Sequence, residues 1–340
     1  MHKAKFILQI GNFISINETH LFMTIRKPKK KTNIGAKKLT KTLKNKMAAI
    51  GFYIFYAFAW LISLLPLPIL YVISDIFYFF IYIIFGYRKK IVRKNLKNAF
   101  PEKSKKELLK IEKKFYHHLI DIFIETIKIM HISDKEIKRR NKFINIDIAK
   151  DLFKTGKAVI GVVGHYNNWE WFNNMQLYSK HQGLAIFKPI NNKRFEKFMN
   201  KIREKYGALA VPMHETLRKL IQLRKEGILP FSLMVADQSP VKEEINYWTR
   251  FLNQDTPVYL GVEKIAKKFD YAVVFMKMRK VKRGYYETEI VLITDKPKET
   301  KDFEITERHV ALLENLIKEQ PEYWIWSHRR WKHKKTKIND

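Results

Sequence analysis

A long apolar tract constrains this chain more than any other feature of its sequence. Residues 47–86 contain one charged side chain, Asp75. The stretch from Ala48 to Leu65 has 18 residues, which is near the lower limit for a helix that crosses a bilayer, and Pro66 and Pro68 then interrupt the helix. Soluble domains rarely keep so long a stretch so uniformly apolar. The tract therefore predicts a helical segment inserted in a membrane.

More than one arrangement of this membrane segment is compatible with the sequence. A second apolar run extends from Ile69 to Phe85, and basic residues flank the tract at 37–46 and at 88–94. Basic flanks favour the cytoplasmic side of a membrane. If both flanks stay inside, the tract is a hairpin, deeply inserted or twice spanning, with its tip near Pro66. A single span leaves one flank outside, and a buried pair of helices in a soluble core is the third alternative.

The charge of the chain limits the classes of partner that it is expected to bind. Its 340 residues include 66 Lys and Arg against 33 Asp and Glu, a net charge of +33, while 46% of the residues are hydrophobic. This combination excludes global disorder, and it points to nucleic acid, an anionic membrane surface or an acidic protein as the contacts. The chain has no cysteine, which excludes disulfides, thiol nucleophiles and Cys-ligated zinc.

The first 46 residues differ from the rest of the chain. They hold twelve Lys or Arg and one acid, Glu18, without a regular apolar face. We interpret residues 1–46 as a solvated or membrane-contacting basic arm, or as an extension that precedes a true start at Met47. No short apolar core followed by a small-residue cleavage site lies near the start, so a secretory signal is not expected.

The remaining sequence predicts a helical connection and an α/β domain. Residues 87–150 form the connection, in which apolar residues between 103 and 131 recur at three- and four-residue spacing, as in an amphipathic helix. In residues 151–340, short apolar strands alternate with helices, which predicts a mixed, mostly parallel sheet flanked by helices. We expect strands at 158–163, 184–187, 208–211, 228–235, 272–278 and 286–293, and helices at 168–180, 192–206, 214–225, 258–268 and 306–320.

A histidine and a carboxylate follow the first strand of this domain. His165 falls at the carboxyl end of the strand, where open α/β sheets carry their sites, and Glu170 comes five residues later, as the next helix begins. A carboxylate can hydrogen-bond one imidazole nitrogen and leave the other free as a base. Gly164 would admit close approach by a substrate. The pair also fits a capped core histidine or a metal ligand, although no second His stands nearby at helical spacing, so neither a metal nor a cofactor is expected.

Further motifs surround this pair. They are Leu65-Pro-Leu-Pro68, Gly86-Tyr-Arg-Lys-Lys90, Asn95-Leu96, Phe100-Pro-Glu102, Gly164-His-Tyr-Asn-Asn-Trp-Glu170, Asn191-Asn192, Arg203-Glu-Lys-Tyr-Gly207, Asp237-Gln238 and Pro321-Glu-Tyr-Trp-Ile-Trp-Ser-His-Arg-Arg-Trp331. With them the chain resembles the lipid A biosynthesis acyltransferases, the lauroyl/myristoyl transferase family, within the glycerolipid acyltransferase superfamily and its His-x4-Asp/Glu signature. The resemblance runs from about Met47 to Lys332, and residues 1–46 have no counterpart in it.

The resemblance implies acyl transfer from a carrier-bound thioester to a hydroxyl of a membrane glycolipid, usually a lipid A precursor. The implied donor is acyl carrier protein, an acidic protein that a basic face would attract. The implied location is the bacterial inner membrane, with the catalytic domain on the cytoplasmic side. His165 would be the general base, and Glu170 would orient it and stabilise its imidazolium form.

Substrate contacts are implied in the same way. The family pattern has a basic residue, often Arg, after the second strand; here it is Lys188, a point charge without the bidentate fork. Arg203 is the better candidate for a substrate phosphate, with a helix-surface charge as its alternative. Asp237 and Gln238 would stand in the site wall, or cap a turn. Asn168 would cap its helix or touch substrate.

The aromatic and basic tail leaves its role open. His328, Arg329 and Arg330 would shape the site or bind headgroups, whereas Trp324, Trp326 and Trp331 would anchor at a membrane interface or pack in the core.

Two other functions remain possible at the level of sequence. The acceptor would be another lipid, an aminolipid or a different glycolipid. A non-enzymatic basic protein that binds membranes or RNA is the second alternative. The chain has no RNP-type aromatic motif, so no nucleic-acid partner is expected.

Overall fold

The computed structural model describes residues 34–335, with side chains from residue 45 onward. Most of the predicted basic arm therefore lies outside the described residues. The helices before the sheet domain are α2 (Ile34–Leu64), α3 (Leu67–Tyr78), the π-helical η1 (Phe79–Ile84), α4 (Lys89–Ala99), α5 (Lys105–Lys128), α6 (Asp134–Arg140) and α7 (Asp147–Lys154). Residue 47 lies inside α2, and a start at Met47 stays a prediction.

A seven-stranded sheet forms the body of the molecule, with the strand order β1-β9-β8-β2-β5-β3-β4. Strand β2 pairs in parallel with β5 and with β8. Strand β9 is antiparallel to β8, and the edge strand β1 is parallel to β9. The strands are β1 (Asn141–Phe143), β2 (Val159–Val163), β3 (Gln182–Phe187), β4 (Leu209–Pro212), β5 (Pro230–Val235), β8 (Ala272–Lys282) and β9 (Tyr285–Thr294). The predicted mixed, mostly parallel sheet is confirmed.

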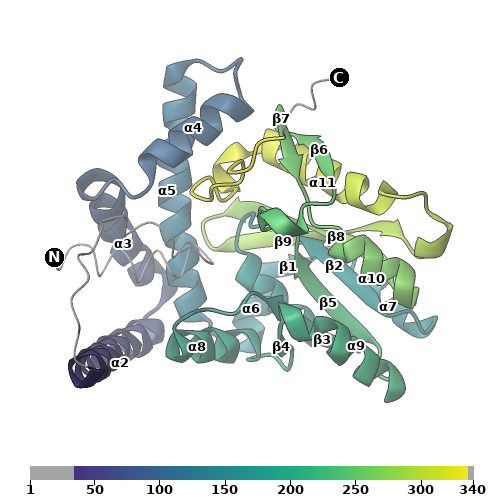
Figure 1. Ribbon diagram of the computed structural model, residues 1–340, viewed down its shortest axis with the longest axis horizontal. Helices are drawn as coiled ribbons and strands as arrows, with labels where there is room; N and C mark the ends of the chain where they lie inside the picture. Colours follow the sequence, from purple (N-terminus) through teal and green to yellow (C-terminus); the bar gives the residue numbers. More distant parts are fainter. Residues whose placement is uncertain (1–33, 336–340) are drawn as a thin grey trace.

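Helices and short turns cover both faces of this sheet (Figure 1). On β2, Ile160 and Val162 belong to one core, and Val159 and Val163 belong to the other, so the strand is buried on both sides. This explains its unbroken apolar run. The covering elements are η2 (Trp169–Leu177), α8 (Lys193–Arg203), η3 (Met213–Glu215), α9 (Thr216–Lys225), η4 (Lys242–Glu244), α10 (Gly261–Phe269), η5 (Pro297–Glu299), α11 (Glu304–Glu319) and η6 (Pro321–Tyr323).

Helix α5 joins the apolar helices to the sheet domain. Its start is fixed by a capping box, in which Ser104 accepts from the backbone of Glu107 and the Glu107 side chain accepts from the backbone of Ser104. Its apolar face is buried along almost its whole length, and α2, α3 and α4 all pack against it. In Figure 1, α5 stands between α3 and the sheet.

The two apolar helical segments lie on the outside of the molecule. Residues 45–64 of α2 and residues 67–84 of α3 and η1 each have the length and composition of a membrane-crossing helix, yet only 22% and 28% of them are buried. A buried pair in a soluble core therefore does not describe them. Pro66 ends the first helix and precedes α3, as predicted. Figure 1 shows α2 along its axis and α3 from the side, so the two helices cross.

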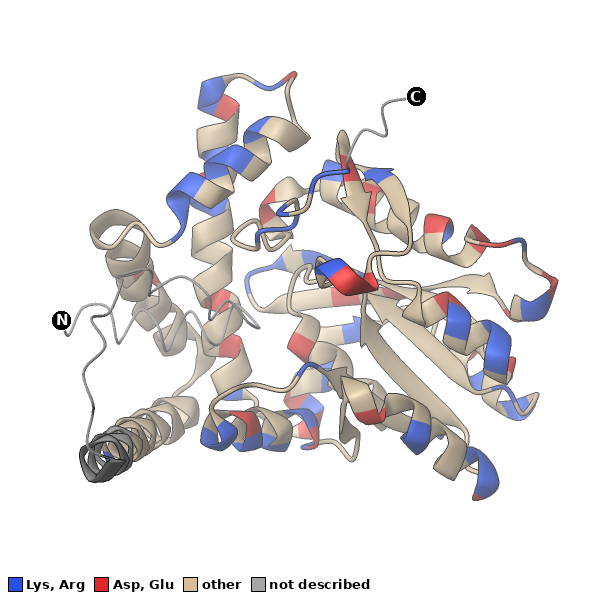
Figure 2. Cartoon of the chain, in the orientation of Figure 1, with Lys and Arg blue, Asp and Glu red and all other residues tan. Residues whose placement is uncertain are grey.

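Charge and apolar surface are separated along the chain. Figure 2 shows Lys and Arg on α4, α8 and α9, whereas α3 is almost free of them. The single charge of the apolar tract, Asp75, faces the protein: its carboxylate lies 2.6 Å from Arg283 Nη2 and 2.9 Å from His117 Nε2. The neighbouring Ser74 donates to Asp121 of α5. The outward face of α3 is thereby left apolar.

Several short elements depart from the sequence expectations. The helix expected at 168–180 is the shorter 3₁₀ helix η2, because a polar segment, Asn167-Asn168, begins it and Asn167 has a positive φ of 52°. The hairpin of β6 (Trp248–Phe251) and β7 (Gln254–Pro257) was not expected; Leu252 and Asn253 form its turn with φ of 48° and 63°. The three-residue β1 was also missed, since it carries too few residues to show a period. Helices α4, α6 and α7 lie within residues 87–150, for which a helical connection was expected without separate bounds.

Candidate active site

Two adjacent parallel strands bring the polar centre of the site together. In the register of β2 and β5, Val163 lies opposite Val235, so both strands end at the same edge of the sheet. The chain then places His165 two residues beyond β2 and Asp237 two residues beyond β5. Parallel strands therefore place side by side two residues that are 72 positions apart in the sequence.

Asp237 holds His165 through both side chain and backbone. Its Oδ1 lies 2.6 Å from Nδ1 of the imidazole, and its Oδ2 accepts from the His165 backbone N–H at 2.8 Å. Trp324 Nε1 donates to the same Oδ2 at 2.8 Å. Burial alone would raise the pKa of the Asp237 carboxyl, but the facing His165 and these donors outweigh it and lower the pKa to about 2. An ionised Asp237 fixes the tautomer with the proton on Nδ1, and Nε2 keeps its lone pair.

Glu170 has a different partner from the one expected. Arg203 Nε and Nη2 donate to its two carboxylate oxygens at 3.1 and 2.9 Å, and both side chains are buried. The expected hydrogen bond from Glu170 to His165 is therefore wrong, because the carboxylate turns toward the Arg203 fork on α8 while Asp237 occupies the imidazole Nδ1. The Arg203 guanidinium also lies 5.4 Å from the Phe187 ring centroid, and its buried Nη1 has no hydrogen-bond partner among the described residues.

Gly164 serves packing and not substrate access. A Cβ at this position would lie 2.7 Å from Leu313 Cδ1 and 3.4 Å from Asp237 Oδ2. The expectation that this glycine admits a substrate is thus wrong. Its missing side chain lets α11 and the Asp237 carboxylate approach the end of β2.

A cavity of about 350 Å³ opens in front of the His165 imidazole. This volume is within the range of small-ligand sites, about 300–1,000 Å³. Its polar wall includes His165, Glu170, Lys188, Arg203 and Gln238. Apolar side chains from both the sheet and the helices line the remainder, among them Phe172, Ala185, Phe195, Met199, Leu233 and Ile265. The cavity therefore has both charged and apolar groups in its lining.

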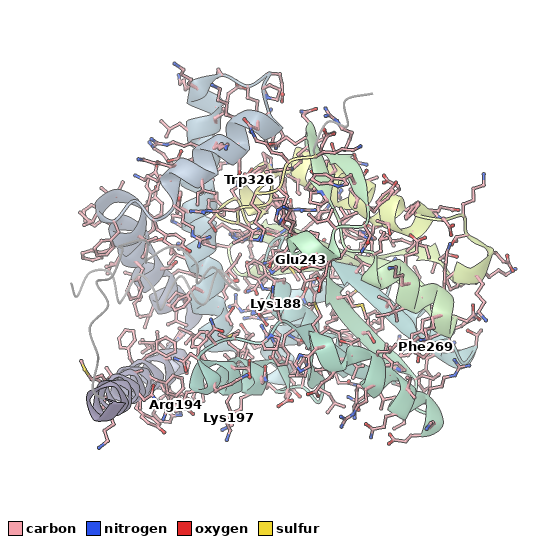
Figure 3. The ribbon with its side chains drawn as sticks, viewed as in Figure 1. Lys188, Arg194, Lys197, Glu243, Phe269 and Trp326 are labelled. Atoms are coloured by element: carbon pink, nitrogen blue, oxygen red, sulfur yellow. The ribbon has the colours of Figure 1, made fainter. Side chains whose placement is uncertain are left out.

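The remaining predicted residues separate into two groups. Gln238 lies at the cavity, with its Nε2 3.2 Å from His165 Nε2, and Lys188 follows β3 and lines the same space (Figure 3). Asp237 lies behind the imidazole and not in the cavity wall. Asn168 neither caps η2 nor lines the cavity; its amide donates to buried Glu125 Oε2 at 2.7 Å.

The tail segment, residues 321–331, packs against the side of the site that is formed by Asp237. Trp324 and Trp326 are almost fully buried, so they pack in the core and do not anchor at an interface. His328 lines the cavity, and burial, with the nearby charges of Arg330 and His165, lowers its pKa to about 3. Arg330 is 2% exposed and lies in a small separate space with Asp237 and His309. Burial lowers its pKa to about 10.

Sequence reasoning missed two contributors to the site. One is the positioning role of Asp237, whose only signal was its place after a strand. The other is Trp169, whose ring lies edge-on to the His165 imidazole with the centroids 5.0 Å apart. In the part of the chain that the structure describes, no three His, Asp or Glu side chains gather closely enough to hold a metal ion.

Comparison with known proteins identifies the family of the chain. No curated protein matches the chain. A family model described as bacterial lipid A biosynthesis acyltransferase matches residues 36–333. Residues 36–46 therefore do have a counterpart in the family, contrary to expectation, and they belong to the first turns of α2. Because the match covers most of the sequence and includes His165, Glu170, Arg203 and Asp237, the chain belongs to the bacterial lipid A biosynthesis acyltransferase family.

Proposed function

We propose that this acyltransferase moves a fatty acyl chain from acyl carrier protein to a hydroxyl of a lipid A precursor, with His165 as the general base. The observation that carries the proposal is the buried Asp237–His165 pair, in which His165 lines the cavity and Asp237 holds it from behind. The pair has the base and the orienting carboxylate of a hydrolytic triad, and the acceptor hydroxyl takes the place of the enzyme nucleophile.

The reaction balances with this pair alone. Nε2 of His165 takes the proton from the acceptor hydroxyl while its oxygen attacks the thioester carbonyl, forming the new C–O bond. The ionised Asp237 stabilises the resulting imidazolium. The tetrahedral intermediate then collapses with cleavage of the C–S bond, and the imidazolium returns its proton to the leaving thiolate. The Gln238 amide, 3.2 Å from Nε2, is within reach of the developing oxyanion, and the incoming hydroxyl displaces its contact with Nε2.

The two kinds of group in the cavity lining suit the two parts of the substrate. The apolar side chains take the acyl chain, for which each buried methylene contributes about 0.8 kcal/mol. Lys188, Arg203 and Lys332 suit phosphates and acidic sugars. The Nη1 of Arg203 is buried and has no hydrogen-bond partner among the described residues, so this side chain keeps one donor that Glu170 does not use.

The proposed location is the cytoplasmic side of the bacterial inner membrane. The exposed apolar faces of α2, α3 and η1 contact lipid, and the surplus of Lys and Arg meets anionic headgroups and the acidic carrier. This placement brings a membrane acceptor and a soluble donor to one site.

The proposal is tested with His165→Ala. Membranes that contain the variant should show acyl transfer at least about 10²-fold slower than wild type, because general-base catalysis contributes about 10²–10⁴-fold. His214→Ala is the matched control, since His214 is exposed on η3 and outside the cavity. Mass spectrometry of membrane lipids gives both the acyl chain and the acceptor. Transfer at the wild-type rate by a folded His165→Ala protein would refute the base assignment.

The same measurement separates acceptors. A mass increase on an aminolipid or on a glycolipid other than a lipid A precursor would replace the proposed acceptor and leave the acyl-transfer chemistry in place.

A further inference from the structure

A second cavity lies away from the active site, where α2 meets the sheet domain. It measures about 320 Å³ and is lined by Tyr56 and Trp60 of α2, by Met130 and His131 after α5, and by Lys201 and Lys205 at the end of α8. None of these residues lines the His165 cavity. We call it the α2–α8 cavity.

Helix α2 is attached to the domain through side chains between residues 55 and 63. Phe55 and Tyr56 pack against Phe198 of α8 with ring centroids 5.7 and 5.9 Å apart. One helical turn further on, Trp60 lies edge-on to His131 at 5.5 Å, and Ser63 Oγ lies 2.6 Å from His131 Nδ1. The opposite face of α2 is apolar and exposed, with Tyr53, Ile54, Phe58, Leu61 and Leu64 directed outward.

This attachment sets the depth of α2 in a bilayer. Helix α8, docked at the middle of the apolar part of α2, exposes Lys193, Arg194, Lys197 and Lys201; Figure 3 labels Arg194 and Lys197 beside α2. If α2 crossed the bilayer, these charges would lie at the centre of the hydrocarbon, where Lys and Arg are strongly disfavoured. The helix therefore lies at the boundary between headgroups and hydrocarbon, with its exposed face toward the acyl chains.

The α2–α8 cavity then lies at the depth of the lipid phosphates. Trp60 and Tyr56 are the residue types that favour this layer. Lys205 Nζ already donates to the carbonyl oxygens of Ile129 and Ile132, which orients the ammonium and leaves one of its three N–H groups beyond those two bonds. Lys201 is exposed at the rim and adds a second positive charge.

We propose that the α2–α8 cavity binds an anionic membrane phospholipid. Lys201 and Lys205 hold the phosphate, Trp60 and Tyr56 cover the glycerol region, and the acyl chains run along the exposed face of α2. This site is separate from the acyl-transfer site and does not depend on the proposed reaction. The bound lipid fills the space between α2 and the domain and so secures the membrane helix to the catalytic body.

The test measures lipid binding to the purified full chain in detergent by native mass spectrometry. Phosphatidylglycerol should form a one-to-one complex with about tenfold higher affinity than phosphatidylcholine, because two Lys side chains face the anionic headgroup. Lys201→Glu should reduce phosphatidylglycerol binding about tenfold, since it replaces an attracting charge by a repelling one. Trp60→Ala should weaken the binding of both lipids, because it removes the ring that packs against the glycerol region.

Matched controls decide the outcome. Lys225→Glu makes the same charge change on exposed α9, outside both cavities, and should leave binding unchanged. Lys201→Gln removes the positive charge without adding a negative one. It should lower the affinity for phosphatidylglycerol less than Lys201→Glu does, with an unaltered melting temperature. Equal binding of the two lipids, or binding unaffected by Lys201→Glu, would overturn the site. Inorganic phosphate that raises the melting temperature as much as short-chain phosphatidylglycerol would show a free-anion site instead of a lipid site.

Discussion

The His165 imidazole is held by a carboxylate that is far away in the sequence. Asp237 Oδ1 lies 2.6 Å from His165 Nδ1, and Asp237 Oδ2 lies 2.8 Å from the His165 backbone nitrogen. Because Asp237 does not line the cavity, a substitution of similar size there changes the imidazole tautomer and not the shape of the cavity. Asparagine has the same size, but an NH2 group replaces one carboxylate oxygen. Because the oxygen is still needed by the His165 N–H and Trp324 Nε1–H donors, the NH2 faces Nδ1 and favours the tautomer with the proton on Nε2. The base would then lack its lone pair toward the acceptor.

Asp237→Asn is therefore expected to lower kcat by about 10⁴-fold with little change in KM, as when a triad carboxylate becomes an amide. Steady-state kinetics with a carrier-bound thioester measures both constants. The pKa of about 2 keeps the wild-type carboxylate ionised throughout the usual assay range, so wild-type activity should show no titration of Asp237 there. A large rise in KM with unchanged kcat would assign Asp237 to substrate binding instead.

Glu170 and Arg203 form part of the cavity wall, and two parallel hydrogen bonds fix their side chains relative to each other. Arg203→Lys keeps the charge but loses the two parallel bonds at 3.1 and 2.9 Å, and it removes the free Nη1 donor. We expect KM for the lipid acceptor to rise about tenfold, since about 1–3 kcal/mol of charge-assisted bonding is lost. Arg194→Lys, at an exposed position of the same helix, is the control. An unaltered KM would remove Arg203 from acceptor recognition.

Single residues of the site were predictable to different degrees. His165 could be placed because a short apolar strand precedes it and its motif is local. The partner of Glu170 could not, since Arg203 is 33 positions away and its direction depends on how α8 docks. The partner of Asn168 could not be predicted either, since the buried Glu125 is on α5, 43 positions earlier in the sequence.

At the scale of elements, β2 and α11 meet at Gly164. A Cβ there would approach Leu313 Cδ1 to 2.7 Å. Gly164→Ala should lower the free energy of unfolding by about 1–3 kcal/mol through overpacking, and Leu313→Val in the same chain should recover part of that loss. Thermal unfolding of the single and double variants measures this coupling. Gly261→Ala is the control, because its Cβ would meet open space at the start of α10. Strictly additive effects would show that the two residues do not compete for volume.

Helix α5 carries a buried carboxylate that ties several elements together. Glu125 accepts from Tyr71 of α3 at 2.9 Å, from Asn168 at 2.7 Å and from Tyr286 of β9 at 2.8 Å. Burial, and then the charge of Asp121, raise its pKa above the ordinary 4.5. A raised pKa in the folded state means that Glu125 favours folding at low pH and that this contribution is lost as the pH rises through the folded value.

Glu125→Gln removes that titration. The stability difference between wild type and variant should be largest near pH 4.5 and should shrink as the pH rises, because only the wild type must ionise a buried group. Melting temperatures across the pH range measure it. Glu299→Gln, which makes the same substitution at an exposed carboxylate on η5, is the matched control. A difference between wild type and Glu125→Gln that does not change with pH would mean that Glu125 titrates normally.

The long elements were predictable and the short ones were not. The strands near 158–163 and 272–278 and the amphipathic helices follow from apolar periods that a chain shows locally. The β6–β7 hairpin and the three-residue β1 have no such period, and they form because the completed sheet and α11 give them partners. The crossing of α2 and α3 likewise depends on α5, to which each is packed.

At the scale of the whole molecule, apolar and basic surfaces occupy adjoining regions. The exposed residues of α2, α3 and η1 make the apolar region, and α4 and α8 carry Lys and Arg next to it (Figure 2). The sequence already contained the net charge of +33 and the apolar tract. It did not show that charged α8 packs against the middle of α2, because that contact is made only when the sheet domain is complete.

The same distribution of charge predicts how the proposed donor, acyl carrier protein, is recognised. An acidic carrier protein approaches a basic enzyme faster than diffusion alone allows, and salt screens this attraction over about 10 Å at 0.1 M. We expect kcat/KM for the carrier-bound acyl donor to fall about tenfold between about 0.02 and 0.2 M NaCl, with kcat at saturating donor unchanged. The same acyl chain on pantetheine lacks the acidic protein, so its kcat/KM should stay flat over this range. Equal salt dependence for both donors would place the effect in the membrane or in the chemical step, and the basic surface would then serve lipid alone.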